Sequence, residues 1–273
     1  MADAREVNLV ILHRGLFSTA KWWFAFAQII RVGAVLTGLA SLLPAVAGFI
    51  PFAVFALTAI AELLSWRSDR TKALAERALR LLEARDGLGT PAPAREVADI
   101  AAEAPAHVRE AAMQATEERY YAAAIEPGPL RLLKNTQESA WWTKHLAGSM
   151  LGITLTIMVV LAALSFIFLI TSINLALAAS NLAVVARVVT AALMIVFSLG
   201  LFRMAIGYAN LRERARTAEA RAATAESASC DTVSALRILH DYQLARAGAP
   251  LIPDLLWRIR RDALNILWSS TQS

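Results

Sequence analysis

The four histidines are the side chains best suited to metal binding or acid–base chemistry, and they are far apart in the sequence. His13, His107, His145 and His240 have no second ligand at the spacing of a metal-binding motif. The chain also contains no HExxH, GxSxG or P-loop sequence. An isolated histidine is ordinarily a solvated or capping side chain. We therefore expect no catalytic residues, no metal and no cofactor, and the protein is not expected to be an enzyme.

Glu62 is a carboxylate within a long apolar stretch, residues 29–66. A charge in membrane hydrocarbon costs roughly 2.5 kcal/mol or more unless it faces a partner or water. Arg31 and Arg203 are the basic residues expected nearest to it in depth. Two interpretations stay open: a structural ion pair, or the polar lining of a conducting or gating pathway.

Gly148 and Gly152 begin a stripe of small residues that continues to Thr156. Small residues one helical turn apart allow a second helix to approach closely. We expect helix packing along this stripe, either inside one molecule or between copies in a homo-oligomer.

These two glycines lie in the first of two long apolar runs in the second half of the chain. Residues 146–170 contain no charge, and this run exceeds the roughly 20 residues with which a helix crosses about 30 Å of hydrocarbon. A second apolar run covers residues 188–202 and extends backward through small uncharged residues. Neither run shows the polar stripe of a helix in a soluble core. The pattern predicts a transmembrane hairpin.

The first half of the chain contains a matching apolar run, residues 29–66. Pro44, Gly48 and Pro51 interrupt it near its centre and predict a reversal of direction. One uninterrupted helix of this length would reach far beyond a bilayer. The sequence therefore predicts an all-α membrane protein with four transmembrane helices in two hairpins and cytoplasmic helical extensions.

Basic residues are concentrated beside the apolar runs, in a chain with 27 Lys and Arg against 22 Asp and Glu. By the positive-inside rule, both termini and the middle segment are predicted to be cytoplasmic. Acidic and basic residues nearly balance between residues 62 and 144, which favours a solvated helical domain over a surface for a nucleic acid polymer. The predicted parts are a juxtamembrane helix at 1–28, hairpins at 29–66 and 146–207, and cytoplasmic helices at 67–145 and 208–273.

Two separated segments resemble signatures of a known family. HRGLFSTAK, residues 13–21, is similar to the QRxxYxxAK pattern that precedes the first span of the SMODS-associating four-transmembrane effectors. DYQLARAGAPLIPDLLWRIRRDALN, residues 241–265, resembles the C-terminal signature of the same family. The matching positions there are Gln243, Arg246, Pro250, Pro253, Asp254, Trp257, Arg261 and Asp262.

The middle segment resembles the family more loosely. The aromatic pair Tyr120 and Tyr121 precedes a proline-containing turn, and a helix with Asn135 and a tryptophan pair follows. The family has a Phe-Asp motif after the second span, where this chain has LEARD at residues 82–86.

The resemblance implies a membrane effector of a bacterial antiphage system. Such a protein lies in the inner membrane, responds to a cyclic oligonucleotide, and permeabilises the membrane by oligomerisation or pore opening, so that infection is abortive. Its cognate nucleotidyltransferase acts on it only through that product. A polyanionic messenger is expected where cytoplasmic cations converge. The candidates are Arg14, Lys21, Arg212, Arg214, Arg216, Arg246, Arg258 and Arg261.

Other interpretations of the same features stay open. Each basic cluster can be an ordinary solvated or lipid-facing surface. The protein can also be a non-conducting membrane scaffold or sensor that signals to a cytoplasmic partner through helices at 67–145 and 208–246. A transporter is disfavoured, because four spans are few and no inverted repeat is evident.

Overall fold

The computed structural model describes residues 7–39, 49–116, 120–176, 181–228 and 231–272. Within these ranges it describes all side chains except those at 39, 165, 168, 169, 171–176, 181–199, 271 and 272. Most of the predicted reversal in the first half, including Pro44 and Gly48, and the tip of the second hairpin at 177–180 lie outside the described residues.

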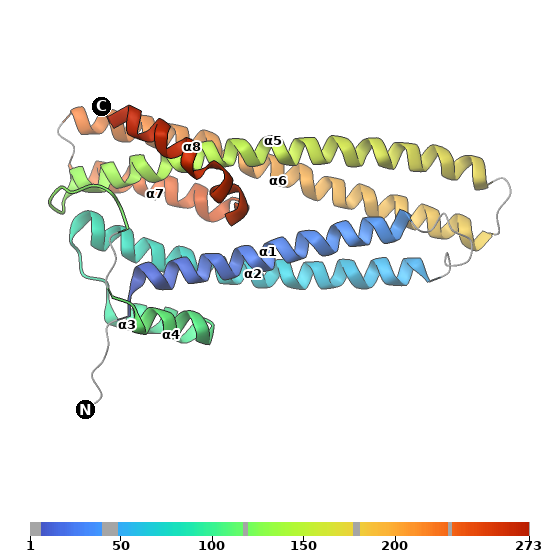
Figure 1. The fold of residues 1–273 in the computed structure, drawn as a ribbon, viewed down its shortest axis with the longest axis horizontal. Coiled ribbons are helices and arrows are strands. Elements are labelled where there is room, and N and C mark those ends of the chain that lie inside the picture. The colour runs from blue at the N-terminus through green and yellow to red at the C-terminus, as the bar shows by residue number, and fades with distance from the viewer. Residues whose placement is uncertain (1–6, 40–48, 117–119, 177–180, 229–230, 273) are drawn as a thin grey trace. The chain divides into compact units, whose positions relative to one another are not determined.

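The described residues form helices and no strands, which confirms the all-α class (Figure 1). Four helices are long and four are short. They are α1 (Leu9–Leu39), α2 (Ile50–Leu88), α3 (Ala94–Glu103), α4 (Ala106–Gln114), α5 (Pro129–Ala176), α6 (Asn181–Ser227), α7 (Thr232–Gly248) and α8 (Asp254–Gln272).

Helix ends in the chain have ordinary local causes. The Asn8 side chain accepts hydrogen bonds from the N–H groups of Val10 and Ile11 and so caps α1. Helix α2 ends at Leu88, directly before Gly89, whose φ of 73° is a left-handed conformation that favours glycine. Pro105 lies between α3 and α4, because a proline lacks the backbone N–H that a continuous helix would use there.

The chain divides into two compact units, and each is considered by itself. The polar unit consists of Met1–Lys21, Ser68–Gly148 and Gly207–Ser273. The apolar unit consists of Trp22–Arg67 and Ser149–Ile206. Three of these divisions lie within a few residues of the boundaries predicted above. The first lies at Lys21, where the sequence predicts residue 28.

Among the described residues, the polar unit contains two large apolar cores and a smaller cluster of Ala147, Leu211 and Ala249. The first is built from α1 to α4, with Leu12, Leu82 and Ile100 among its fully buried side chains. The second is built from α5, α6 and α7 around Leu132 and Tyr242. Both cores are water-excluding interiors of the kind found in soluble helical proteins.

The apolar unit has the opposite distribution. Ala34 of α1 is buried against Ile50 and Val54 of α2, whereas large side chains point outward, with Phe52 77% and Val159 63% exposed. Within the described residues, two helices are long and apolar enough to cross a membrane: α2, and α5 as far as Leu164.

Candidate functional site: buried charges between α2 and α7

Three charged residues of α2 are buried in the polar unit. Lys72 is 8%, Glu76 1% and Glu83 2% exposed. Their spacings of four and seven residues place them on one face of the helix. Charged side chains are rarely buried unless they are paired, so their partners define the site.

Arg246 of α7 is the partner of both glutamates. Its Nε donates to Oε2 of Glu76 at 3.0 Å, and its Nη1 donates to Oε1 of Glu83 at 2.8 Å. Gln243, one turn earlier on α7, donates to Oε2 of Glu83 at 2.6 Å. Burial alone would lower the pKa of Arg246, but Glu83 and Glu76 raise it well above its ordinary value. The guanidinium therefore stays charged.

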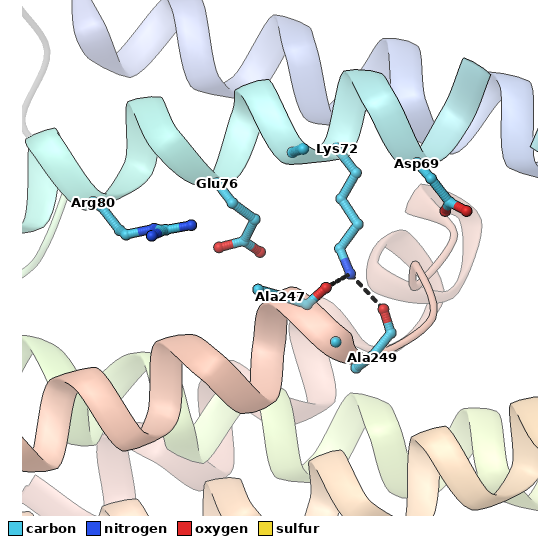
Figure 2. A pocket seen from close by; sticks show the side chains of 8 residues that line it. Asp69, Lys72, Glu76, Arg80, Ala247 and Ala249 are labelled. Atoms are coloured by element: carbon cyan, nitrogen blue, oxygen red, sulfur yellow. Dashed lines mark hydrogen bonds between the residues drawn. The ribbon is translucent and has the colours of Figure 1, made fainter. Parts of the chain in front are cut away.

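Lys72 caps the C-terminal end of α7 (Figure 2). Its Nζ donates to the carbonyl oxygens of Arg246 at 3.1 Å and Ala247 at 2.8 Å, and also to that of Ala249. These carbonyls lie at the C-terminal end of a helix, where the backbone has partial negative charge and unpaired acceptors. Burial lowers the pKa of Lys72. Its charge is thus held by main-chain oxygens of another helix.

A cavity of about 290 Å³ lies beside this contact. Figure 2 shows Glu76 and Lys72 directed from α2 toward α7, with Arg80 and Asp69 on either side of them. The mixed lining of two carboxylates and two cations has no clear preference for an anion or a cation. We therefore assign this region to the coupling of α2 with α7 and not to the capture of a ligand.

The N-terminal helix reaches the same network through two tyrosines. The hydroxyl of Tyr121 donates to Oε1 of Glu83 at 3.4 Å. Tyr120 packs edge-on against His13 with ring centroids 4.7 Å apart, and the Arg14 guanidinium lies 5.5 Å from the Tyr120 ring centre. Burial lowers the pKa of His13 to about 4, so its imidazole is neutral at pH 7.

The C-terminal signature is anchored a short distance away. Lys21 donates to Oδ1 of Asp254, the first residue of α8, at 2.6 Å. The hydroxyl of Tyr208 donates to the carbonyl oxygen of Leu251 at 2.7 Å. An added Cβ at Gly207 would lie 2.6 Å from Cδ of Pro250. Pro250 of the signature therefore packs closely on α6, four residues before α8 begins at Asp254.

The candidate ligand-binding cations fall into two groups. The first group makes contacts inside the polar unit: Arg14 lies beside the Tyr120 ring, Lys21 binds Asp254, and Arg246 binds Glu76 and Glu83. A phosphate could bind Arg246 only by displacing both of its carboxylates, so in this structure Arg246 is an internal cation. The other candidates lie on exposed faces of α6 and α8: Arg212, Arg214, Arg216, Arg258 and Arg261, the last of which pairs with Asp262.

Two of the three candidates for intramembrane polar residues, Arg31 and Glu62, form an ion pair in the apolar unit. Arg31 donates to Glu62 at 2.8 Å and to the hydroxyl of Ser65 at 2.9 Å. The structure thus contains the ion pair that was one of the two interpretations of Glu62. Its carboxylate side is 65% exposed, so it also faces the surroundings. Arg203 lies on an exposed face of α6.

The two glycines of the small-residue stripe differ in their surroundings. A Cβ added at Gly148 would lie 3.4 Å from the side chain of Arg212 on α6, so this glycine serves packing inside the molecule. A Cβ added at Gly152 would have no neighbour within 4 Å. The second position is therefore open to another helix or to lipid.

The sequence analysis did not single out Lys72, Glu76 or Glu83 as site residues. One signal in the sequence could have identified them: these charged residues occur on the apolar face of α2, which also carries the buried side chains of Ala75 and Leu79. Within the described residues, no group of three or more His, Cys, Asp or Glu side chains could hold a metal ion. No family model, curated protein or solved structure matches this chain.

Proposed function

We propose that this protein is a membrane effector of bacterial antiphage defence, which answers a cyclic-oligonucleotide messenger by permeabilising the inner membrane. One observation carries the proposal: residues that resemble the family in three separated segments are in contact. Tyr121 of the middle segment and Gln243 and Arg246 of the C-terminal signature meet at Glu83. The two terminal signatures meet where Lys21 binds Asp254.

The apolar unit supports the membrane part of the proposal. Large apolar side chains such as Phe55 and Phe166 are 72% and 64% exposed, and in water such a surface would drive aggregation. We propose four spans in two hairpins, α1 with α2 and α5 with α6, with both termini in the cytoplasm. The Arg31–Glu62 pair would then reduce the cost of a carboxylate at membrane depth.

The coupling of messenger to membrane would pass through α2. This helix contains Glu76 and Glu83, whose partners lie on α7, and it also contains Glu62 and the exposed phenylalanines of the apolar unit. A ligand that shifts the packing of α7 changes the contacts of α2. Copies of the protein that associate through their apolar units would then open a path for ions.

Co-expression with an active cyclic-oligonucleotide synthase tests the proposal. We expect a voltage-sensitive dye to report depolarisation only when both proteins are active, and a catalytically dead synthase is the first control. Glu83→Gln should abolish or strongly reduce the response, because it removes one of the two carboxylates that bind Arg246 and the charge that Tyr121, Gln243 and Arg246 share. Glu213→Gln, an exposed glutamate on α6, is the matched control and should respond normally. An intact potential with the active synthase would refute the proposal.

The alternative is a non-conducting scaffold or sensor, and the Arg31–Glu62 ion pair is the observation that favours it. Under this alternative, toxicity requires another gene and the membrane potential stays intact. Glu62→Gln separates the two functions. A pore-lining carboxylate predicts altered leakage or ion preference, whereas a structural pair predicts only a change in thermal stability.

A further inference from the structure

A second cavity in the polar unit lies outside the buried charges and has a volume of about 500 Å³. This volume is in the range of sites for small organic ligands. The connection before α5, the first turns of α5 and the last turns of α6 and α8 line it. The lining side chains with polar or aromatic groups are Lys134, Gln137, Glu138, Glu226 and Trp268.

Three of these residues lie on one face of α5. Lys134, Gln137 and Glu138 are related by spacings of three and four residues, so their side chains converge. Lys134 is already paired with Glu226, with Nζ and Oε1 2.8 Å apart. The remaining carboxylate, Glu138, gives the lining a net negative charge. A phosphate is therefore unsuited to the interior of this cavity.

Glu138 has acceptor capacity for a ligand. The N–H of Ala122 donates to its Oε2 at the long distance of 3.3 Å. A carboxylate has two oxygens and about four acceptor sites. Burial raises the pKa of Glu138, in agreement with a position partly withdrawn from water. The group is suited to a ligand edge that presents adjacent N–H donors.

Trp268 supplies an aromatic wall from α8. Its side chain is half-buried, and its ring centroid lies 5.1 Å from that of Trp141 on α5, which supports it from inside the unit. Nucleobases stack on aromatic side chains and are read by hydrogen bonds to their edges. The cavity offers both: the Trp268 indole is a stacking surface, and Glu138 and Gln137 can form hydrogen bonds with the edge of a base.

We propose that this cavity binds a purine base, with guanine as the best fit, and that it receives one base of the messenger. The base packs against Trp268, its N1–H and exocyclic amino group donate to Glu138, and Gln137 contacts the remaining edge. The phosphates stay outside, where the lining charge does not repel them. This inference rests on the proposed function, since it names the part of the messenger that is recognised.

The test measures nucleotide binding by calorimetry and tryptophan fluorescence, with the full chain in nanodiscs and with GMP, AMP and CMP as probes. We expect GMP to bind at least tenfold more tightly than CMP. Glu138→Gln should weaken GMP binding about tenfold or more. Trp268→Ala should abolish it, and Trp268→Phe should retain it within a few-fold because an aromatic surface remains. Glu213→Gln and Trp257→Ala, exposed residues on α6 and α8 outside the cavity, should bind normally.

Three outcomes would overturn the assignment. They are no binding of purine nucleotide at millimolar concentration, binding that Glu138→Gln and Trp268→Ala leave unchanged, and tighter binding of the cation agmatine than of GMP. The result is separable from the proposed function. Depolarisation that survives Glu138→Gln removes this site and keeps the effector, whereas GMP binding without depolarisation keeps the site and removes the effector.

Discussion

The two units each contain an arginine bound to glutamate, and the two pairs differ in what surrounds them. In the polar unit, the side chain of Arg246 is 12% exposed and the side chains of its partners Glu76 and Glu83 are 2% and 3% exposed. In the apolar unit, the side chain of Arg31 is 21% exposed and that of Glu62 is 65% exposed. Protein groups surround the ion pair of Arg246 on nearly all sides. The Arg31–Glu62 pair is open to the medium around the apolar unit, so the strength of this pair will change with that medium.

The same contrast holds for apolar side chains. The polar unit encloses leucines and tyrosines such as Leu132 and Tyr208, whereas the apolar unit buries small residues such as Ala27 and Ala61 and exposes phenylalanines. Which side chains are expected to be buried therefore depends on whether water or lipid surrounds the unit. A pattern that would be unstable in water is the expected one where lipid is the solvent.

The sharpest way to test the comparison is to remove the enclosed cation. Arg246→Met leaves Glu76 and Glu83 buried without a counter-charge, which should destabilise the protein by about 3–5 kcal/mol. Arg221→Met is the control, because Arg221 and Asp241 form an exposed pair with side chains 44% and 49% exposed, and such pairs contribute about 0–1 kcal/mol. Unfolding in mild detergent measures both. Equal losses would show that Arg246 is not solvated by protein alone.

A second prediction concerns the medium around the apolar unit. Val159→Arg places a charge on an outward face of α5, and in hydrocarbon it should cost about 2.5–3.5 kcal/mol and reduce membrane integration. Val233→Arg makes the same change at a residue of the polar unit that is 72% exposed, where the free energy should change by less than about 0.5 kcal/mol. Carbonate extraction and thermal unfolding compare the two. If Val159→Arg integrates normally, water and not lipid faces that side.

A third prediction uses the buried imidazole of the polar unit. The folded-state pKa of His13 is about 4, below its ordinary value of 6.5, so protonation favours the unfolded chain. The contribution of neutral His13 to the free energy of unfolding is fully present above pH 6.5. It is lost as the pH falls toward 4, and about 2 kcal/mol is lost at pH 5. His13→Phe should therefore lose less stability than the native protein between pH 7 and pH 5.

The control for this prediction is His107→Gln, because His107 is exposed on α4. Its acid sensitivity should match that of the native protein in the same thermal unfolding series. An unchanged pH dependence in His13→Phe would place the acid-sensitive group elsewhere.

The smallest expected effect compares two glycines of α6, one in each unit. Gly207→Ala brings a methyl group against Pro250, at 2.6 Å before any adjustment, and should cost at least about 1 kcal/mol. Gly200→Ala has no neighbour within 4 Å and should be neutral or stabilise the helix by up to about 1 kcal/mol. Thermal unfolding in detergent distinguishes them. A loss at Gly200 measured only in the membrane would indicate that another helix lies there.

The sequence was sufficient for the all-α class, because that class depends on the local pattern of apolar and polar residues. It also indicated which segments are apolar. It could not predict that Arg246 binds Glu76 and Glu83, because that contact depends on the packing of α7 on α2. The C-terminal signature drew attention to Arg246 and Gln243, but it presented Arg246 as a ligand contact. Of its acidic partners, Glu83 lies in the LEARD segment and Glu76 lies seven residues before Glu83. From the sequence alone, such charged residues on a helix are expected to face water, and only the structure shows that they are buried.

Lys72 is also a natural reporter of movement. An amine that donates to the carbonyl oxygens of Arg246, Ala247 and Ala249 has no free lone pair while it is protonated and enclosed. Reagents that acylate lysines will therefore modify it only during the moments when α2 and α7 separate. The rate at which Lys72 is acylated, relative to that of the partly exposed Lys134, therefore measures how often the polar unit opens.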